Sequence, residues 1–212
     1  MRILSVNVGL PVDAEWAGNL KRTAIDKRPV EGRVPVLVNG LGGDQRADMV
    51  AHGSPDQAVY AYAREDYDWW EPQLGRELRN GRFGENLTTS GVDLSRTLLG
   101  EKWRVGTAIL EVTAPRIPCV VFRNWLDEQG WIKRFTAAAR PGTYFRVIEL
   151  GELGVGDEIE ILSRPDNSVT IAEAFHAYHG DRDLMRRILS YPGHRWAWDR
   201  VAERVIKGET HR

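Results

Sequence analysis

The single cysteine of the chain, Cys119, has the residue type and the setting that most favour chemistry. It ends the segment Pro115-Arg116-Ile117-Pro118-Cys119, whose two prolines keep it out of the middle of a sheet. A thiol acts as a nucleophile or metal ligand in its thiolate form, which a nearby cation such as Arg116 favours. The segment therefore predicts a rigid loop that presents Cys119 to a ligand. The alternative is a buried, inert cysteine that packs as a small apolar residue.

A run of cationic residues near the N-terminus, residues 21–28, is a candidate anion site. Lys21, Arg22, Thr23 and Lys27 could form a cradle for a phosphate, in which the cations donate charge-assisted hydrogen bonds. The alternative is a solvated loop or strand edge, where such runs usually lie.

Asp44, Asp48 and His52 follow Gly42-Gly43 at four-residue spacing. On a helix the three side chains would share one face and could hold a metal. The glycines and aspartates favour a loop instead. We therefore expect polar side chains at the mouth of a β-barrel, where they could touch a ligand.

A second glycine-rich segment, residues 80–89, contains Arg82 and Asn86. Its glycines allow the backbone to approach an anion closely. It lacks the Lys-Ser or Lys-Thr pair of a phosphate-binding loop, so the motif alone is weak.

Short β-branched runs separated by Gly, Pro and Asn fill the first three quarters of the chain and predict a mainly β fold. Such a series is typical of a barrel or sandwich. Helical spacing predicts two inserted helices. The predicted strands are 3–8, 34–39, 59–62, 85–88, 103–105, 109–113, 145–150 and 158–162, and the predicted helices are 64–78 and 124–139.

Near residue 167 the hydrophobic period changes from two to 3.6. Thr170 and Glu173 form a capping-box signature, and three short apolar stripes follow. We therefore predict a β-barrel domain over residues 1–165 and a small C-terminal domain of three helices over residues 168–212. A unit this small is expected to dock on the barrel or on a partner subunit, and a homodimer is left open.

The overall composition excludes several classes of protein. The 212 residues carry 29 basic and 30 acidic side chains, so no net field attracts nucleic acid or anionic lipid. No apolar stretch is long enough to span a membrane, and the N-terminus does not have the pattern of a signal peptide. One cysteine cannot form an intrachain disulfide, which fits a reducing compartment. We expect a cytoplasmic protein with neither nucleic acid nor membrane as partner.

Taken together, these segments resemble the MOSC domain, which is found at the C-terminus of molybdenum-cofactor sulfurases and in stand-alone proteins. With its helical tail, the chain is most similar to the bacterial N-hydroxylaminopurine-resistance branch of that family. The resemblance covers nearly the whole chain and runs in the family's order. The matching segments are residues 23–29, 40–48, 52–62, 81–88, 115–119 and 142–147 with 156–157.

The resemblance implies a β-barrel that binds the molybdenum cofactor, molybdopterin, with Cys119 as a sulfur ligand of the metal. It implies that the cofactor's phosphate and pterin meet Lys21, Arg22, Thr23, Lys27 and Arg82, and that His52, Asn86 and Arg116 line the cavity. The chain departs from the family at Ala24, Ser54 and Gln57, where Thr-Gly-Ile, His-Gly-Gly and a lysine are common.

The implied function is an oxidoreductase that reduces N-hydroxylated bases or related N–O compounds. Its partners would be a small-molecule substrate and a separate electron-donor reductase, because the chain has no flavin or iron–sulfur motif. One alternative is a non-catalytic module that carries the cofactor, or a sulfane sulfur, on Cys119. Another is an interaction protein whose barrel has lost the cofactor.

Overall fold

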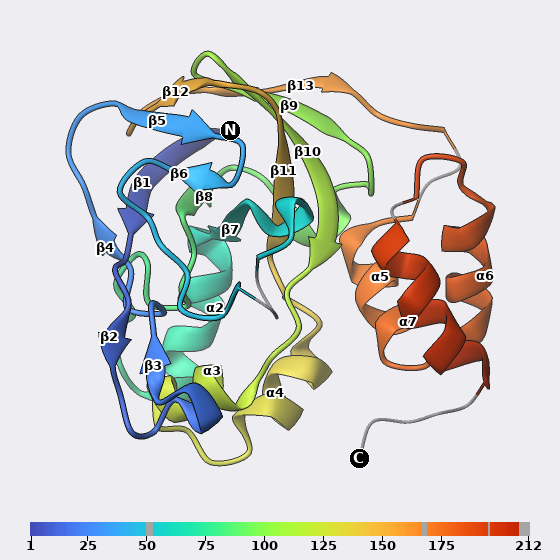
Figure 1. The fold of residues 1–212 in the computed structure, drawn as a ribbon, viewed down its shortest axis with the longest axis horizontal. Coiled ribbons are helices and arrows are strands. Elements are labelled where there is room, and N and C mark those ends of the chain that lie inside the picture. The colour runs from blue at the N-terminus through green and yellow to red at the C-terminus, as the bar shows by residue number, and fades with distance from the viewer. Residues whose placement is uncertain (50–52, 167–168, 195, 208–212) are drawn as a thin grey trace.

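The computed structural model describes residues 1–49, 53–166, 169–194 and 196–207. Its main feature is an eight-stranded mixed sheet in the order β13-β9-β10-β11-β7-β8-β1-β4 (Figure 1). The strands are β1 (Arg2–Val8), β4 (Arg28–Pro29), β7 (Val59–Ala63), β8 (Leu87–Ser90), β9 (Lys102–Val105), β10 (Ala108–Pro115), β11 (Thr143–Glu149) and β13 (Ile159–Ser163).

All neighbouring strands of this sheet are antiparallel except β7 and β8, which are parallel. The helix α2 (Arg64–Leu74) connects them, as a parallel pair requires a crossover. Two smaller sheets join β12 (Gly151–Leu153), β5 (Val34–Leu37) and β6 (Gly40–Leu41), and β2 (Val12–Asp13) with β3 (Arg22–Thr23).

The predicted mainly β fold with added helices is confirmed in part: a large sheet and the helices are present, but no closed barrel is found in the described residues and the chain is not purely β. In the described residues the sheet ends at β13 and β4, which pair only with β9 and β1. One isolated bridge, Arg2 with Glu158, joins β1 to the segment before β13. The edge strand β4 has two residues, the second of which is Pro29, and proline cannot donate a ladder hydrogen bond. Six α-helices accompany the sheets within the described ranges.

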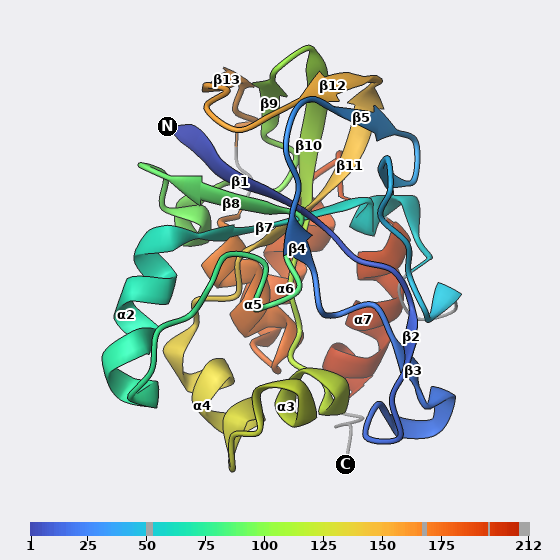
Figure 2. The same ribbon diagram turned by 90° about the vertical axis from the view of Figure 1, so that its left-hand side faces the viewer.

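Three helices cover one end of the sheet: α2, α3 (Val120–Leu126) and α4 (Trp131–Ala138) (Figure 2). The single helix predicted over 124–139 is two helices, because Asp127 and Gly130 adopt left-handed conformations between them. A buried aromatic cluster holds these helices together, and it includes Trp70, Phe83, Phe122, Trp131 and Phe135. The cluster therefore fixes the start of α3, where Cys119 lies.

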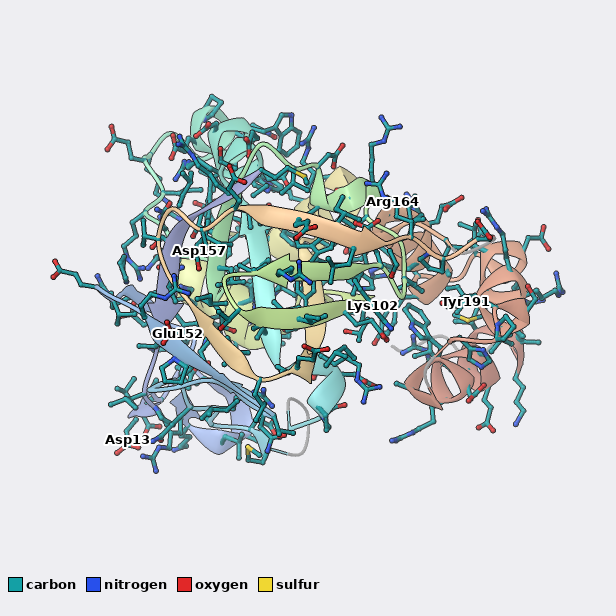
Figure 3. The ribbon with its side chains drawn as sticks, turned by 90° about the horizontal axis from the view of Figure 1, so that it is seen from above. Asp13, Lys102, Glu152, Asp157, Arg164 and Tyr191 are labelled. Carbon is teal, nitrogen blue, oxygen red and sulfur yellow. The ribbon has the colours of Figure 1, made fainter. Side chains whose placement is uncertain are left out.

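The three C-terminal helices are α5 (Ile171–Tyr178), α6 (Arg182–Ser190) and α7 (Trp196–Lys207). The predicted capping box of Thr170 and Glu173 begins α5. The helices pack on the sheet in one continuous apolar core, and the Trp198 indole donates a hydrogen bond to the Thr113 carbonyl of β10 at 3.2 Å. In Figure 3, Tyr191 after α6 and Asp13 of β2 lie at opposite ends of the molecule. The division into two domains stays a prediction.

Within the described residues, no helix combines the length and the apolar character that a membrane span would need.

Candidate functional site

A cavity of about 360 Å³ lies between the β2–β3 hairpin, the loop after β6 and the start of α3. Residues far apart in sequence line it. They are Ala17, Gly18, Asn19, Leu20, Arg22, Thr23, Ala24, Ile25, Lys27, Asp44, Gln45, Arg46, Ala47, Asp48, Gln57, Tyr60, Gly84, Asn86, Arg116, Cys119, Val121 and Tyr144.

Cys119 is half-buried in the wall of this cavity. Strand β10 ends at Pro115, and Cys119 is the N-cap residue of α3 with extended backbone angles. Its side chain makes no capping hydrogen bond. The thiol is therefore held at the cavity by the helix start without being engaged in the helix itself.

Arg116 provides a buried positive charge in the same cavity, with 7% of its surface exposed. Its guanidinium lies 4.1 Å from the centre of the Phe122 ring and donates a hydrogen bond to the Phe83 carbonyl at 2.7 Å. Burial alone would lower the pKa of Arg116, but Tyr144, Tyr60 and Cys119 raise it above its ordinary value.

No carboxylate pairs with Arg116 among the described residues, and its Nε atom is buried without a hydrogen-bond partner. Buried charges are normally paired, because the loss of hydration is costly. The unpaired guanidinium is therefore suited to hold an anionic ligand.

Lys27 lines the cavity, and a carboxylate there already neutralises it. Its ammonium donates to Asp44, and both side chains are less than a tenth exposed. Asp44 also accepts hydrogen bonds from the Gly9 amide at 2.8 Å and from the Asn86 side chain at 2.9 Å. Burial lowers the pKa of Lys27, and Asp44 opposes that shift. The network ties four chain segments together at the cavity wall.

Substitution of Asp44 by Asn is expected to destabilise the protein by about 3–5 kcal/mol, because it leaves the Lys27 ammonium buried without its counter-ion. The double variant Lys27→Met with Asp44→Asn should lose clearly less stability, because no charge then remains buried. Urea unfolding measures both free energies. Equal losses in the single and double variants would contradict the assigned pairing.

The structure brings six of the predicted site residues to one cavity: Arg22, Thr23, Lys27, Asn86, Arg116 and Cys119. Lys21 and Arg82 are not among the residues that line it. Lys21 is exposed and pairs with Glu15 at 2.7 Å. His52 lies outside the described residues.

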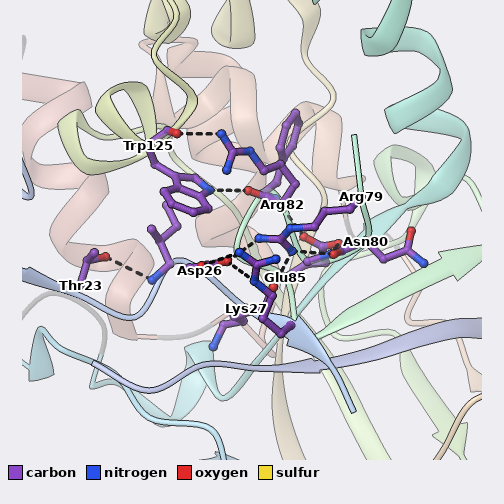
Figure 4. A network of polar contacts seen from close by, with 12 residues as sticks. Thr23, Asp26, Lys27, Arg79, Asn80, Arg82, Glu85 and Trp125 are labelled. Atoms are coloured by element: carbon purple, nitrogen blue, oxygen red, sulfur yellow. Dashed lines mark hydrogen bonds and ion pairs between the residues drawn. The ribbon is translucent and has the colours of Figure 1, made fainter. Parts of the chain in front are cut away.

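Arg82 lies behind the cavity wall and faces α3 (Figure 4). Its guanidinium sits 4.1 Å from the centre of the Trp125 ring and donates to the Trp125 carbonyl at 3.0 Å. The Trp125 indole in turn donates to the Arg82 carbonyl at 2.7 Å. The geometry thus assigns Arg82 to the support of α3 and not to the cavity predicted for it.

The sequence did not single out Tyr60, Tyr144 or the hairpin tip, residues 17–20, as site residues. Tyr60 and Tyr144 come from β7 and β11, and their rings lie 5.0 Å apart. All five residues of β7 are buried, so alternation gives no sign of which face meets a ligand. Gln57 also lines the cavity, at the position where the family commonly has a lysine.

The charge of the lining is positive, with four cationic side chains against two acidic ones. No group of three or more His, Cys, Asp and Glu side chains that could hold a metal occurs in the described part of the chain. The cavity is suited to an anionic ligand whose soft atom lies beside the thiol.

Comparisons with known proteins identify the family of the chain. The model of the MOSC domain family matches residues 48–160. The protein YflK of Bacillus subtilis strain 168, described as uncharacterized, is 36% identical over 191 residues, which are 89% of this chain and 86% of YflK.

Two further matches concern a longer protein and a solved structure. A protein of Gibberella moniliformis named a reductase is 31% identical over 170 residues, which are 77% of this chain and 29% of the fungal protein. The crystal structure of YiiM from Geobacillus stearothermophilus superposes with a TM-score of 0.79 at 30% identity, covering 96% of this chain and 98% of YiiM. The chain belongs to the MOSC domain family.

Proposed function

We propose that this chain is a cytoplasmic oxidoreductase that binds the molybdenum cofactor and reduces N-hydroxylated bases or related N–O compounds. The observation that carries the proposal is the pairing, in one cavity, of the half-buried Cys119 thiol with the buried Arg116 guanidinium that lacks a carboxylate partner. Membership of the MOSC family and the similarity to a fungal reductase support it.

The residues of the cavity fit the cofactor in charge and in donor type. The cofactor is anionic, and Arg116 has hydrogen-bonding capacity that no described residue fills. A thiolate is a soft ligand and suits a metal that is already bound by sulfur. We infer that Cys119 would ligate the metal and that Arg116, with Arg22 and Arg46 nearby, would hold the anionic part of the cofactor.

The chain contributes binding, orientation and exclusion of water. When bound, the cofactor supplies the two-electron chemistry. Arg116 is fixed by the Phe83 carbonyl and the Phe122 ring, so its donors keep one orientation. The Lys27–Asp44–Asn86 network fixes the opposite wall without adding net charge. The buried Tyr60 closes the floor and donates its hydroxyl to the Pro141 carbonyl at 2.9 Å.

The proposed reaction breaks the N–O bond of the substrate. An N-hydroxylamino group takes up two electrons and two protons and gives an amino group and one water molecule. The electrons come from a separate reductase protein, and the protons come from solvent at the cavity mouth, where Leu20 and Arg22 are exposed.

The test is an anaerobic assay of protein purified from a host that makes the cofactor. A chemical reductant such as reduced methyl viologen replaces the natural donor, and N-hydroxylaminopurine is the substrate. We expect aminopurine to form only with the cofactor-loaded protein. Loaded protein that forms no product above the cofactor-free control would contradict the enzyme and favour the carrier function.

A further inference from the structure

The β2–β3 hairpin forms one side of the cavity that contains Cys119. Its tip, residues 17–20, lines the cavity, and Leu20 is 53% exposed, which places it at the mouth. Only two residue pairs join β2 to β3, and neither strand belongs to the main sheet. The hairpin therefore gains little support from the sheet and must be held by side chains.

A three-layer stack provides that support. Trp16, just before the tip, stacks on Trp125 of α3 with ring centres 5.9 Å apart and planes 22° apart. Arg82 contacts Trp125 by its guanidinium, 4.1 Å from the ring centre, and the side chain of each residue donates a hydrogen bond to the backbone carbonyl of the other. The Asn124 side chain adds a hydrogen bond of 2.7 Å to the Trp16 carbonyl.

The stack connects the hairpin to the helix that begins at Cys119. Trp125 and Asn124 lie in α3, and Cys119 is the N-cap residue of that helix. Arg82 comes from the segment before β8, so the stack joins three segments distant in sequence. The tip that covers the cavity and the thiol inside it are thereby held in one spatial relation.

We propose that the hairpin tip is a size filter for ligands that approach Cys119, and that Trp16, Trp125 and Arg82 are the positioning residues that keep the filter closed. This deepens the proposed function by limiting the substrate to a small molecule, such as a free base, that can pass the tip. The size filter does not depend on the cofactor. The filter can therefore be disproved while the proposed function stands, and the proposed function can be disproved while the filter stands.

The experiment uses the fact that Cys119 is the single cysteine of the chain. Two maleimides of different size, N-ethylmaleimide and fluorescein maleimide, are reacted with the intact, cofactor-free protein. Both rates are followed by mass spectrometry, and each is divided by the rate of the same reagent with free glutathione to remove the difference in intrinsic reactivity. Wild type should react much faster with the small reagent. Trp16→Ala should raise the rate with the large reagent by roughly two- to tenfold, the population change expected when one aromatic contact is lost. The rate with the small reagent should hardly change.

Arg82→Ala should have the same effect, although Arg82 is not part of the cavity wall, so the change cannot come from space left by a deleted lining side chain. Trp16→Phe should restore the wild-type ratio because it keeps an aromatic ring. Trp69→Ala is the matched control: Trp69 is 37% exposed like Trp16 and also contacts a second tryptophan ring, that of Trp70, but lies on α2 away from the hairpin.

Two outcomes would overturn the proposal. In one, Trp16→Ala and Arg82→Ala keep the wild-type ratio of the two rates. In the other, both reagents accelerate by the same factor, which would indicate general loosening of the fold. Thermal unfolding of each variant identifies any that fail to fold. Asn124→Ala, which removes only the hydrogen bond to the Trp16 carbonyl, then carries the comparison with Trp69→Ala and should also raise the rate with the large reagent selectively.

Discussion

Replacement of Cys119 by serine is expected to abolish reduction of N-hydroxylated substrates while leaving the protein at least as stable as wild type. Serine oxygen is a harder donor than thiolate sulfur and is a poor ligand for a metal bound by sulfur. Cys119 is also the N-cap residue of α3 and makes no capping hydrogen bond. Serine is a preferred N-cap residue, so it could stabilise the helix by roughly 0.5–1 kcal/mol. The measurement is the reduction rate of loaded protein beside the urea unfolding free energy.

The matched control is Cys119→Ala, which removes the same sulfur without offering a capping oxygen. Both variants should be inactive, and the serine variant should be the more stable of the two. A serine variant that keeps full activity would show that the thiolate is not needed. A serine variant that unfolds at much lower urea would show instead that Cys119 serves the packing.

The second large effect is expected at Arg116. Replacement by Met keeps an unbranched side chain beside Phe122 and removes the charge, the donors and the guanidinium contact with the ring. Loss of a hydrogen bond to a charged group should weaken retention of the cofactor by roughly 10- to 150-fold. Stability should fall by about 1–3 kcal/mol, because the Phe83 carbonyl loses its buried donor.

Molybdenum retained after gel filtration measures the first effect, and urea unfolding measures the second. Arg104→Met is the matched control. Arg104 lies on β9, is exposed and pairs with Glu160 of β13 at 2.9 Å. It should change stability by less than about 1 kcal/mol and leave retention unchanged. Equal retention in the two variants would remove Arg116 from the proposed anion site.

The sequence predicted the gathering of distant residues better than it predicted their individual roles. The basic run and the ordered family segments together supplied Arg22, Thr23, Asn86, Arg116 and Cys119, which line one cavity. The role of Lys27 was not visible, because its carboxylate partner Asp44 lies on another loop. A cation is recognised from one residue, whereas its neutralisation depends on a tertiary contact.

Arg82 and the barrel illustrate the same limit. Glycines on both sides of Arg82 suggested a loop that binds an anion, but the Arg82 side chain contacts Trp125 instead. Trp125 lies in α3, whose C-terminal residues were predicted to belong to a longer helix over 124–139. Local strand patterns gave most strands of the sheet. Closure depends on how the two ends of the sheet meet. In the described residues the start of β1 meets the segment before β13 through the Arg2–Glu158 bridge and a few backbone hydrogen bonds between residues 1–3 and 156–159, without a continuous strand pair.

X-ray absorption at the molybdenum edge tests the central claim most directly. The measurement compares wild type with Cys119→Ser, both purified from a host that makes the cofactor. We predict that wild type contains molybdenum and that the serine variant, where it retains the metal, has one sulfur neighbour fewer. Wild type without molybdenum, or identical sulfur coordination in the two proteins, would contradict the assignment of Cys119 as the metal ligand.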